Sequence, residues 1–441
     1  EPDETQSGLN QVDVSIFDGS LYWDGGSWSE TEAWNRTEGN SDWSYNLSST
    51  DLSDGLTYFI SSRATDAVGN VQQEFGLDSF TYDITEPQTT INIQNIFYNQ
   101  TGFTSEQPLV GTASDEISGL SLVEISILNT ETSQYWNRSS WSDGVYWNGI
   151  DDSQNWSYPD LDVSSLDDGT EYLVEVRSVD IAGNVEASVE QDFFTFDTTR
   201  PGSEIQISRE FYNNSNWLDA SSINGVTIDA TSGIESISLT IRRGSDQYYW
   251  GGSGWTLDET WLSPDGGVDA WAYGYNLNNL TNGVSYYVSS RATDVAGNVQ
   301  LPDFFGQDTF TFDVTAPNVG SVNDGNLASD QDWSNSTEVF SANWSGFSDV
   351  TSGIVGYEYS IGTTPGATDV LFWTENGQEI EFSVPVTVLS GSDYYVSVRA
   401  TDAADNVSNI ATSDGITIDA LDPTVSGILE GSTSEDYDYQ Q

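Results

Sequence analysis

The sequence predicts an all-β chain of tandem β-sandwich domains, and three observations carry this prediction. A strand–turn–strand unit recurs four times with a period near 110 residues. Within each copy, apolar and polar residues alternate with the two-residue period of a strand. A short Asp-x-x-x-Pro segment follows every copy. A period of this length matches a whole sandwich domain and not one turn of a solenoid.

The four copies predict β-hairpins. In the second copy, inward positions at Tyr172, Val174 and Val176 alternate with outward ones, and Asp-x-x-Gly-Asn then supplies a tight turn because Gly or Asn accepts a positive φ. A second strand follows the turn. The copies are Tyr58–Val71, Tyr172–Val185, Tyr286–Val299 and Tyr394–Val407.

Each copy is preceded by a Gly three residues before its Tyr, and by a Leu before that Gly, as in Leu166-Asp-Asp-Gly-Thr-Glu-Tyr172. This pattern predicts the tyrosine corner of immunoglobulin and fibronectin type III sandwiches. With boundaries at the linker prolines, we expect four immunoglobulin-like/fibronectin type III-like domains in a rod-like array. They cover residues 1–86 (lacking its first strands), 87–200, 201–316 and 317–422, and residues 423–441 form a tail, a further repeat's start or a donor strand.

The Asp-Thr-Thr-x-Pro linkers and Ala-x-Asp-x-Ala-Gly-Asn turns together resemble the tandem immunoglobulin-like repeats of large bacterial and archaeal secreted surface proteins and adhesins. The resemblance covers essentially the whole chain. It implies an extracellular or cell-surface stalk, adhesin or fibre component, often rigidified by calcium. Because this fold serves many functions, the motifs specify the domain type better than the role.

Composition excludes several function classes. The chain has no Cys, His or Met, its ten basic residues are all Arg, and its formal net charge is −60. Thiolate and imidazole chemistry are therefore absent, and nucleic acid and anionic lipid surfaces are unsuitable partners. No apolar run is long enough to span a bilayer, so we expect no membrane insertion in this segment. The recurring acids lie in turns and do not face each other across a cleft, so we expect no enzyme.

Recurring acids predict calcium sites where one domain meets the next. The acid of each linker should meet the acids of the B–C and F–G turns of the following domain, and Ca²⁺ suits such oxygen-rich sets. Asn184 or Asn298 could add a ligand. The alternative is that these side chains only cap turns. The candidates are Asp83, Asp115 and Asp180; Asp197, Asp229 and Asp294; Asp313, Asp349 and Asp402; and, at the ends of the chain, Glu4, Asp66 and Asp419.

Tryptophans recur at matching positions in the first three repeats. They either pack an irregular hairpin or stack on sugars, and Trp28, Trp141 and Trp255 are the glycan-binding candidates. Four arginines share one outward strand position, where a Trp face or a cross-strand acid would hold them: Arg63, Arg177, Arg291 and Arg399. Asn-x-Ser/Thr sequons, only slightly more numerous than chance, mark possible glycosylation at Asn35, Asn46, Asn99, Asn137, Asn155, Asn213, Asn279, Asn335, Asn343 and Asn406.

The two ends of the sequence leave two readings open. The chain is either a window cut from a longer array, whose partners are neighbouring repeats, or a subunit whose C-terminal strand completes the first domain of the next copy in a head-to-tail filament. We therefore expect a structural surface stalk or filament subunit, with an adhesin that binds glycans or other surface proteins as the alternative.

Overall fold

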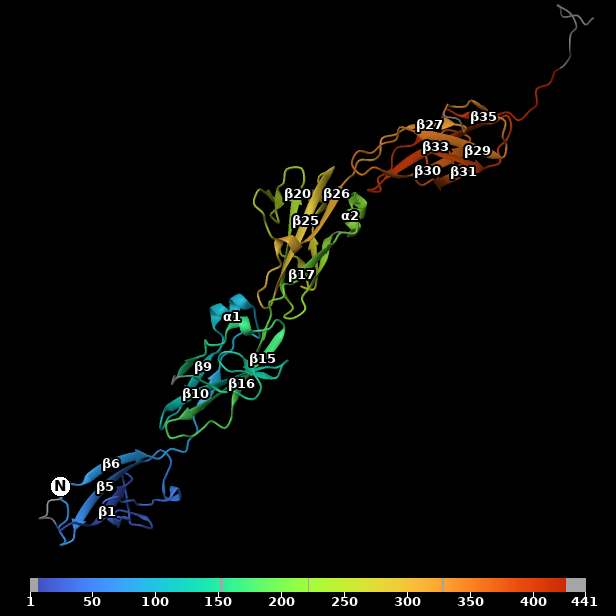
Figure 1. Ribbon diagram of the computed structural model, residues 1–441. Helices are drawn as coiled ribbons and strands as arrows, with labels where there is room; N and C mark the ends of the chain where they lie inside the picture. Colours follow the sequence, from blue (N-terminus) through green and yellow to red (C-terminus); the bar gives the residue numbers. More distant parts are fainter. Residues whose placement is uncertain (1–6, 151–153, 221, 327–328, 426–441) are drawn as a thin grey trace, which may run out of the picture. The chain divides into compact units, whose positions relative to one another are not determined.

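The computed structural model describes residues 7–150, 154–220, 222–326 and 329–425, and nearly all of its regular structure is β (Figure 1). The chain divides into two compact units. Unit 1 contains Glu1–Arg200 together with Asp229–Gly233 and Asp294–Asn298, and unit 2 contains the remaining residues up to Gln441. The predicted all-β fold is confirmed. No helix among the described residues is long and apolar enough to cross a membrane.

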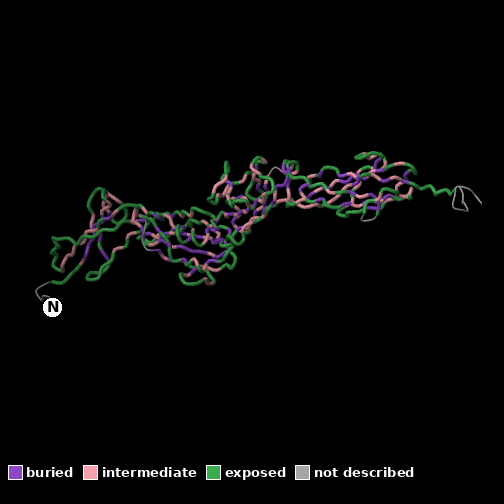
Figure 2. Tube along the Cα trace, turned by 90° about the horizontal axis from the view of Figure 1, so that it is seen from above, coloured by how far each residue is buried: buried purple, intermediate pink, exposed green. Residues whose placement is uncertain are grey.

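The first part of unit 1 is one six-stranded sheet of order β3-β2-β1-β5-β6, with β4 also on β1. Its elements are β1 (Leu9–Phe17), β2 (Tyr22–Trp23), β3 (Trp28–Ser29), β4 (Asn35–Arg36), η1 (Ser49–Asp51), β5 (Thr57–Asp66) and β6 (Gly76–Thr81). No second sheet covers it among the described residues, and every residue of β6 is exposed. Figure 2 accordingly shows few buried positions along the first segment of the trace.

The second part of unit 1 has two sheets, one of order β12-β11-β10-β15-β16-β8 with β13 on β10, and one of order β14-β9-β7. Its elements are β7 (Gln88–Ile91), β8 (Phe97–Tyr98), α1 (Gln100–Glu106), β9 (Val110–Ser114), β10 (Leu120–Asn129), β11 (Gln134–Trp136), β12 (Trp141–Ser142), β13 (Asn148–Ile150), β14 (Asn155–Ser157), η2 (Val163–Ser165), β15 (Thr170–Asp180) and β16 (Glu190–Phe196).

Unit 2 repeats the two-sheet arrangement over residues 202–312, with sheet orders β17-β19-β24-β23 and β18-β26-β25-β20-β21-β22. The elements are β17 (Gly202–Gln206), β18 (Phe211–Tyr212), α2 (Asn214–Ala220), β19 (Ser222–Ile228), β20 (Ile234–Arg243), β21 (Tyr249–Trp250), β22 (Trp255–Thr256), β23 (Asp265–Gly266), β24 (Ala270–Gly274), η3 (Leu277–Asn279), β25 (Val284–Asp294), η4 (Pro302–Phe304) and β26 (Gly306–Phe312).

The last two sheets of unit 2 have orders β27-β29-β32 and β28-β35-β33-β30-β31, with β34 also on β33. Their strands are β27 (Ser321–Asp324), β28 (Trp333–Ser334), β29 (Val339–Ser345), β30 (Ile354–Gly362), β31 (Leu371–Glu375), β32 (Glu381–Pro385), β33 (Asp393–Asp402), β34 (Ala411–Thr412) and β35 (Ile416–Ile418).

The predicted hairpins and tyrosine corners are present. Along β15 every second residue from Thr170 is buried, as the alternation predicts, and Gly183 in the following turn has φ +97°. The Tyr172 hydroxyl accepts the backbone N–H of Asp167 at 2.7 Å, and the bond recurs in the other three copies. This hydrogen bond anchors the segment that precedes the hairpin to the buried tyrosine near the start of the strand.

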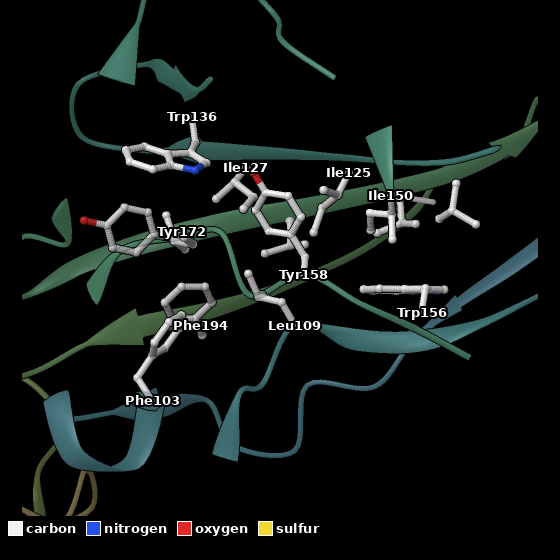
Figure 3. Close-up of a cluster of buried hydrophobic side chains, with 14 of the residues drawn as sticks. Phe103, Leu109, Ile125, Ile127, Trp136, Ile150, Trp156, Tyr158, Tyr172 and Phe194 are labelled. Atoms are coloured by element: carbon white, nitrogen blue, oxygen red, sulfur yellow. The ribbon is translucent and has the colours of Figure 1, made fainter. Parts of the chain in front are cut away.

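Aromatic and aliphatic side chains together fill the core between the two sheets of residues 88–196 (Figure 3). Phe103 of α1 contacts Phe194, and Phe194 stacks on Tyr172. Trp156 lies over Gly111, where an added Cβ would meet its ring at 2.4 Å, so this position requires glycine. Without a second sheet to receive it among the described residues, the matching Trp43 is 41% exposed.

Two predictions fall outside the described residues: the site role of Glu4 and the structure of positions 426–441. The four domain boundaries remain predictions, because the two-unit division does not test them.

Candidate metal centres at three aspartate triads

Three groups of aspartates converge as the sequence pattern predicts. In each group, one carboxylate oxygen per residue lies within 4.8 Å of those of the other two. The first triad is Asp83, Asp115 and Asp180; the second is Asp197, Asp229 and Asp294; the third is Asp313, Asp349 and Asp402. The first two triads lie in unit 1 and the third in unit 2.

The same three structural positions supply each triad. In the first triad, Asp83 lies on the linker after β6, Asp115 follows β9, and Asp180 ends β15. The linker acid and the β-hairpin acid are buried, and the acid between them is half-buried. Strand β9 leads into β10 and β15 into β16, so the triad joins two turns of one sandwich to the segment that precedes it.

The turn-capping role that was the alternative to calcium is also present. Asp115 accepts the N–H groups of Ile117, Ser118 and Gly119 through Oδ1 at 2.8–3.1 Å. Asp180 accepts two N–H groups of its own turn through Oδ1. Capping therefore accounts for the turns. In Asp180 the second oxygen also accepts the Asn184 side chain, whereas in Asp115 the cap uses one oxygen and leaves the other.

Two carboxylate oxygens of the triads are not used in turn capping. Oδ2 of Asp115 and Oδ1 of Asp229 are buried and accept no hydrogen bond among the described residues. A buried polar atom without a partner costs about 1–3 kcal/mol, and more for a charged group. Capping alone leaves this cost uncompensated, whereas a cation bound in each of the two triads would satisfy the oxygen there.

Burial and like charge act on the acids of the second triad. Burial, with the nearby carboxylates as a further cause, raises the pKa of Asp197 and of Asp294 above the ordinary range. In the third triad burial likewise raises the pKa of Asp402. Each of these sites therefore disfavours its own negative charge unless a positive charge is bound nearby.

The turn asparagines have a role that sequence analysis missed. We expected Asn184 to offer an oxygen, but its Nδ2 donates to the carbonyls of Asp83 and Thr85 and to Oδ2 of Asp180. Asn298 and Asn406 make the equivalent bonds to the carbonyl and carboxylate of their own triads. The Asp-x-x-Gly-Asn spacing carried this signal, because it places the Asn amide within reach of both the linker carbonyls and the turn acid.

The fourth F–G turn departs from the pattern as its sequence indicated. Asp405 stands where the other copies have Gly, and it adopts the left-handed conformation with φ +68°. Its carboxylate accepts a charged hydrogen bond from Nη1 of Arg209 at 2.6 Å.

The remaining candidate acids join no triad among the described residues. Asp66 caps its own turn through Val68 and Asn70, and the backbone hydrogen bond from Asn70 is the main cause that lowers its pKa. Asp419 is exposed and accepts the N–H of Leu421.

Both kinds of partner that the sequence suggested are found at the repeated arginines, with a tryptophan at all four and an acid at Arg63, Arg177 and Arg399. Arg177 lies over the ring of Trp147 at 4.2 Å and pairs with Glu124 at 2.7 Å. Arg399 does the same with Trp373 and Glu358. Arg63 and Arg291 also lie over tryptophans, so these four arginines pack on the outer face of the sheet.

The glycan-binding candidates are packing residues in this structure. Trp141 stacks on Tyr172, contacts Trp136 and donates its indole N–H to the Ser165 carbonyl. Trp28 makes the same set of contacts, and Trp255 packs on the equivalent rings beneath Arg243. Sugar binding by these rings remains a prediction.

The sequon asparagines differ in exposure. Asn46, Asn155 and Asn335 are exposed. Asn35 and Asn213 are buried, and Asn35 donates its side-chain amide to the Trp23 carbonyl. Asn99, Asn137, Asn279, Asn343 and Asn406 are half-buried.

No family model and no curated protein matches the chain. Among solved structures, it is similar to a 1.5-MDa bacterial ice-binding adhesin (17% identity, 76% of this chain and 98% of that chain, TM-score 0.35). It is also similar to a tetra-tandem repeat from the extending region of a large adhesion protein (18%, 95% and 93%, 0.31) and to a Ca²⁺-stabilized adhesin of an Antarctic bacterium (18%, 93% and 91%, 0.28). These proteins are of the class of large surface adhesins that the sequence motifs resemble.

Proposed function

We propose that the chain is an extracellular structural protein, a cell-surface stalk or filament subunit, in which calcium at the three triads fixes consecutive β-sandwiches. One observation carries the proposal. Acids at the same three structural positions converge in three places, and two of these triads keep a buried carboxylate oxygen that accepts no hydrogen bond from the described residues.

Calcium fits the donor set. It takes 6–8 oxygen ligands at about 2.3–2.6 Å in tolerant geometry, so Asp115 and Asp229, which cap their turns through one oxygen, can still offer the other. The chain contains no Lys or His, and its formal charge is −60, so external cations must supply most of the compensation.

A cation at a triad would act on the linker. Asp83 belongs to the segment before β7, while Asp115 and Asp180 belong to turns beyond it. An ion bound by all three would hold that segment against the turns, adding to the Asn184 bonds. Loss of the ion would leave three like charges that push the segment away.

Calcium counting and electron microscopy test the proposal on the full chain. In equilibrium dialysis with calcium, the Asp180→Asn variant should bind one ion fewer than the unsubstituted chain, and so should the Asp402→Asn variant. The control Asp162→Asn changes only the cap of η2 and should bind as many ions as the unsubstituted chain. Electron micrographs should show straight particles in the presence of calcium and bent, flexible particles after chelation. Unchanged ion counts in both triad variants would refute the calcium sites.

Polymerisation by strand addition is a second candidate, favoured by the open sheet of residues 9–81. Its β6 carries Leu77 at 78% exposure, and no second sheet covers this sheet among the described residues. An added strand from another copy would bury such surface. Deletion of residues 423–441 should then abolish end-to-end assembly, and unchanged polymers would rule the mechanism out.

A further inference from the structure

A fourth group of acids belongs to the last sandwich and shares no residue with the three triads. One carboxylate oxygen each of Asp324, Asp330 and Asp414 lies within 4.8 Å of the others. Asp324 ends β27, Asp330 lies between β27 and β28, and Asp414 lies in the break between β34 and β35. These positions do not belong to the repeated turn motifs, so the repeat pattern gave no reason to select them.

Asp324 is the unusual member of this group. Its side chain is fully buried, with 0% exposure, and Oδ2 accepts the N–H of Gly415 at 3.0 Å. Its Oδ1 is buried as well and accepts no hydrogen bond from the residues that the structure describes. A buried carboxylate with one bare oxygen is costly unless a positive charge or a proton compensates it.

The local backbone holds the three acids together. Asp330 accepts the N–H of Asp324 at 2.7 Å, and Gln331 donates its N–H to the Asp324 carbonyl. Gly415 has φ +106°, a left-handed conformation that brings the chain back after Asp414. In the other two-sheet segments the corresponding strands β16 and β26 run unbroken, so this break is a local feature of the last sandwich.

No positive side chain is available to compensate the group. Arg399 is the only basic residue after position 317, and it is paired with Glu358 at 2.7 Å and stacked on Trp373. Asp332 adds further negative charge near Asp414. A compensating charge has to come from solvent.

We propose that Asp324, Asp330 and Asp414 bind a divalent cation of the calcium type within the last sandwich. Asp330 and Asp414 are exposed, so water would complete the ligand set. Ca²⁺ tolerates an irregular arrangement of carboxylates, whereas Mg²⁺ demands near-ideal octahedral geometry, so the site suits Ca²⁺ better. The bound ion would fasten the β34–β35 break to the end of β27.

Calcium counting on the full chain, at neutral pH and physiological salt, tests the site. Asp414→Asn, at an exposed position, should lose one bound ion relative to the unsubstituted chain, and Asp330→Asn should do the same. Glu379→Gln, an exposed acid of the same sandwich outside the group, should lose none. Hydrogen exchange in peptides covering residues 409–417 should slow by about tenfold on calcium addition, and Asp414→Asn should abolish that slowing.

The outcomes separate this site from the triads. A loss in Asp414→Asn with none in Asp402→Asn would support this site and count against the triad proposal. The reverse would overturn the present inference and leave the triads standing. If the ion count and the exchange rates are unchanged in both Asp330→Asn and Asp414→Asn, the two carboxyls share a proton and bind no metal, and the inference is wrong.

Discussion

Substituting Asp115 by Asn should change the stability of unit 1 in opposite directions with and without calcium. The amide keeps an oxygen that can accept the N–H groups of Ile117, Ser118 and Gly119, so the turn cap survives. What changes is the second atom, which is now a neutral N–H₂ group facing Asp83 and Asp180 in place of a bare anionic oxygen.

The magnitude follows from Coulomb's law at 4.8 Å, the upper limit of the spacing between the carboxylate oxygens. Two charges 4.8 Å apart repel by about 3.5 kcal/mol at an effective dielectric of about 20, and by about 0.9 kcal/mol in bulk water. Neutralising Asp115 removes two of the three repulsive pairs, which gives about 2–7 kcal/mol. Because Asp115 is half-buried and salt screens it, we expect a stabilisation of about 2–3 kcal/mol without calcium.

Differential scanning calorimetry of the full chain, in calcium-free buffer and in millimolar-calcium buffer, measures the stability change under both conditions. The variant should unfold at a higher temperature than the unsubstituted chain without calcium and at a lower one with it, because one ligand of the ion is lost. Asp162→Asn, at a cap outside the triads, should give the same small shift in both buffers. A calcium-independent shift in Asp115→Asn would refute the metal reasoning and leave turn capping as the whole role.

Three further predictions concern single side chains. Tyr172→Phe removes the acceptor of the Asp167 N–H and should cost about 1–3 kcal/mol in denaturant unfolding; no change would mean that the corner bond is dispensable. Burial raises the pKa of Asp324 to about 7, so without metal its contribution to stability is fully present below about pH 4 and is lost as the pH rises towards 7. The shift in pKa corresponds to about 4 kcal/mol in the free energy of unfolding. Calorimetry at several pH values should show stability falling with pH over this range, and Asp324→Asn should flatten that slope; an identical slope in the variant would contradict this cause. Trp141→Ala should destabilise unit 1 by about 3–5 kcal/mol, and wild-type stability combined with lost glycan-array binding would instead identify a sugar platform.

The sequence by itself determined the fold class and the repeated parts of the candidate sites. Local patterns sufficed because a strand's two-residue alternation, a left-handed Gly and a corner Tyr are properties of short segments. The triads could also be predicted, since acids at fixed positions of one repeated topology must meet at the same place in every copy. The Arg177–Trp147 contact follows similarly from one repeated outward strand position.

Only the tertiary structure decided which atoms remained without partners. Hydrogen bonding within each turn leaves Oδ2 of Asp115 bare and directs the Asn184 amide to the linker carbonyls, and neither result can be read from spacing. The Asp324 group was invisible in the sequence for a related reason. Asp414 is 90 positions from Asp324 along the chain, and a break in one strand, which no repeat shares, brings them together. Packing between segments that are distant in the sequence brings these carboxylates together, and it therefore determines how much negative charge a bound cation would have to compensate.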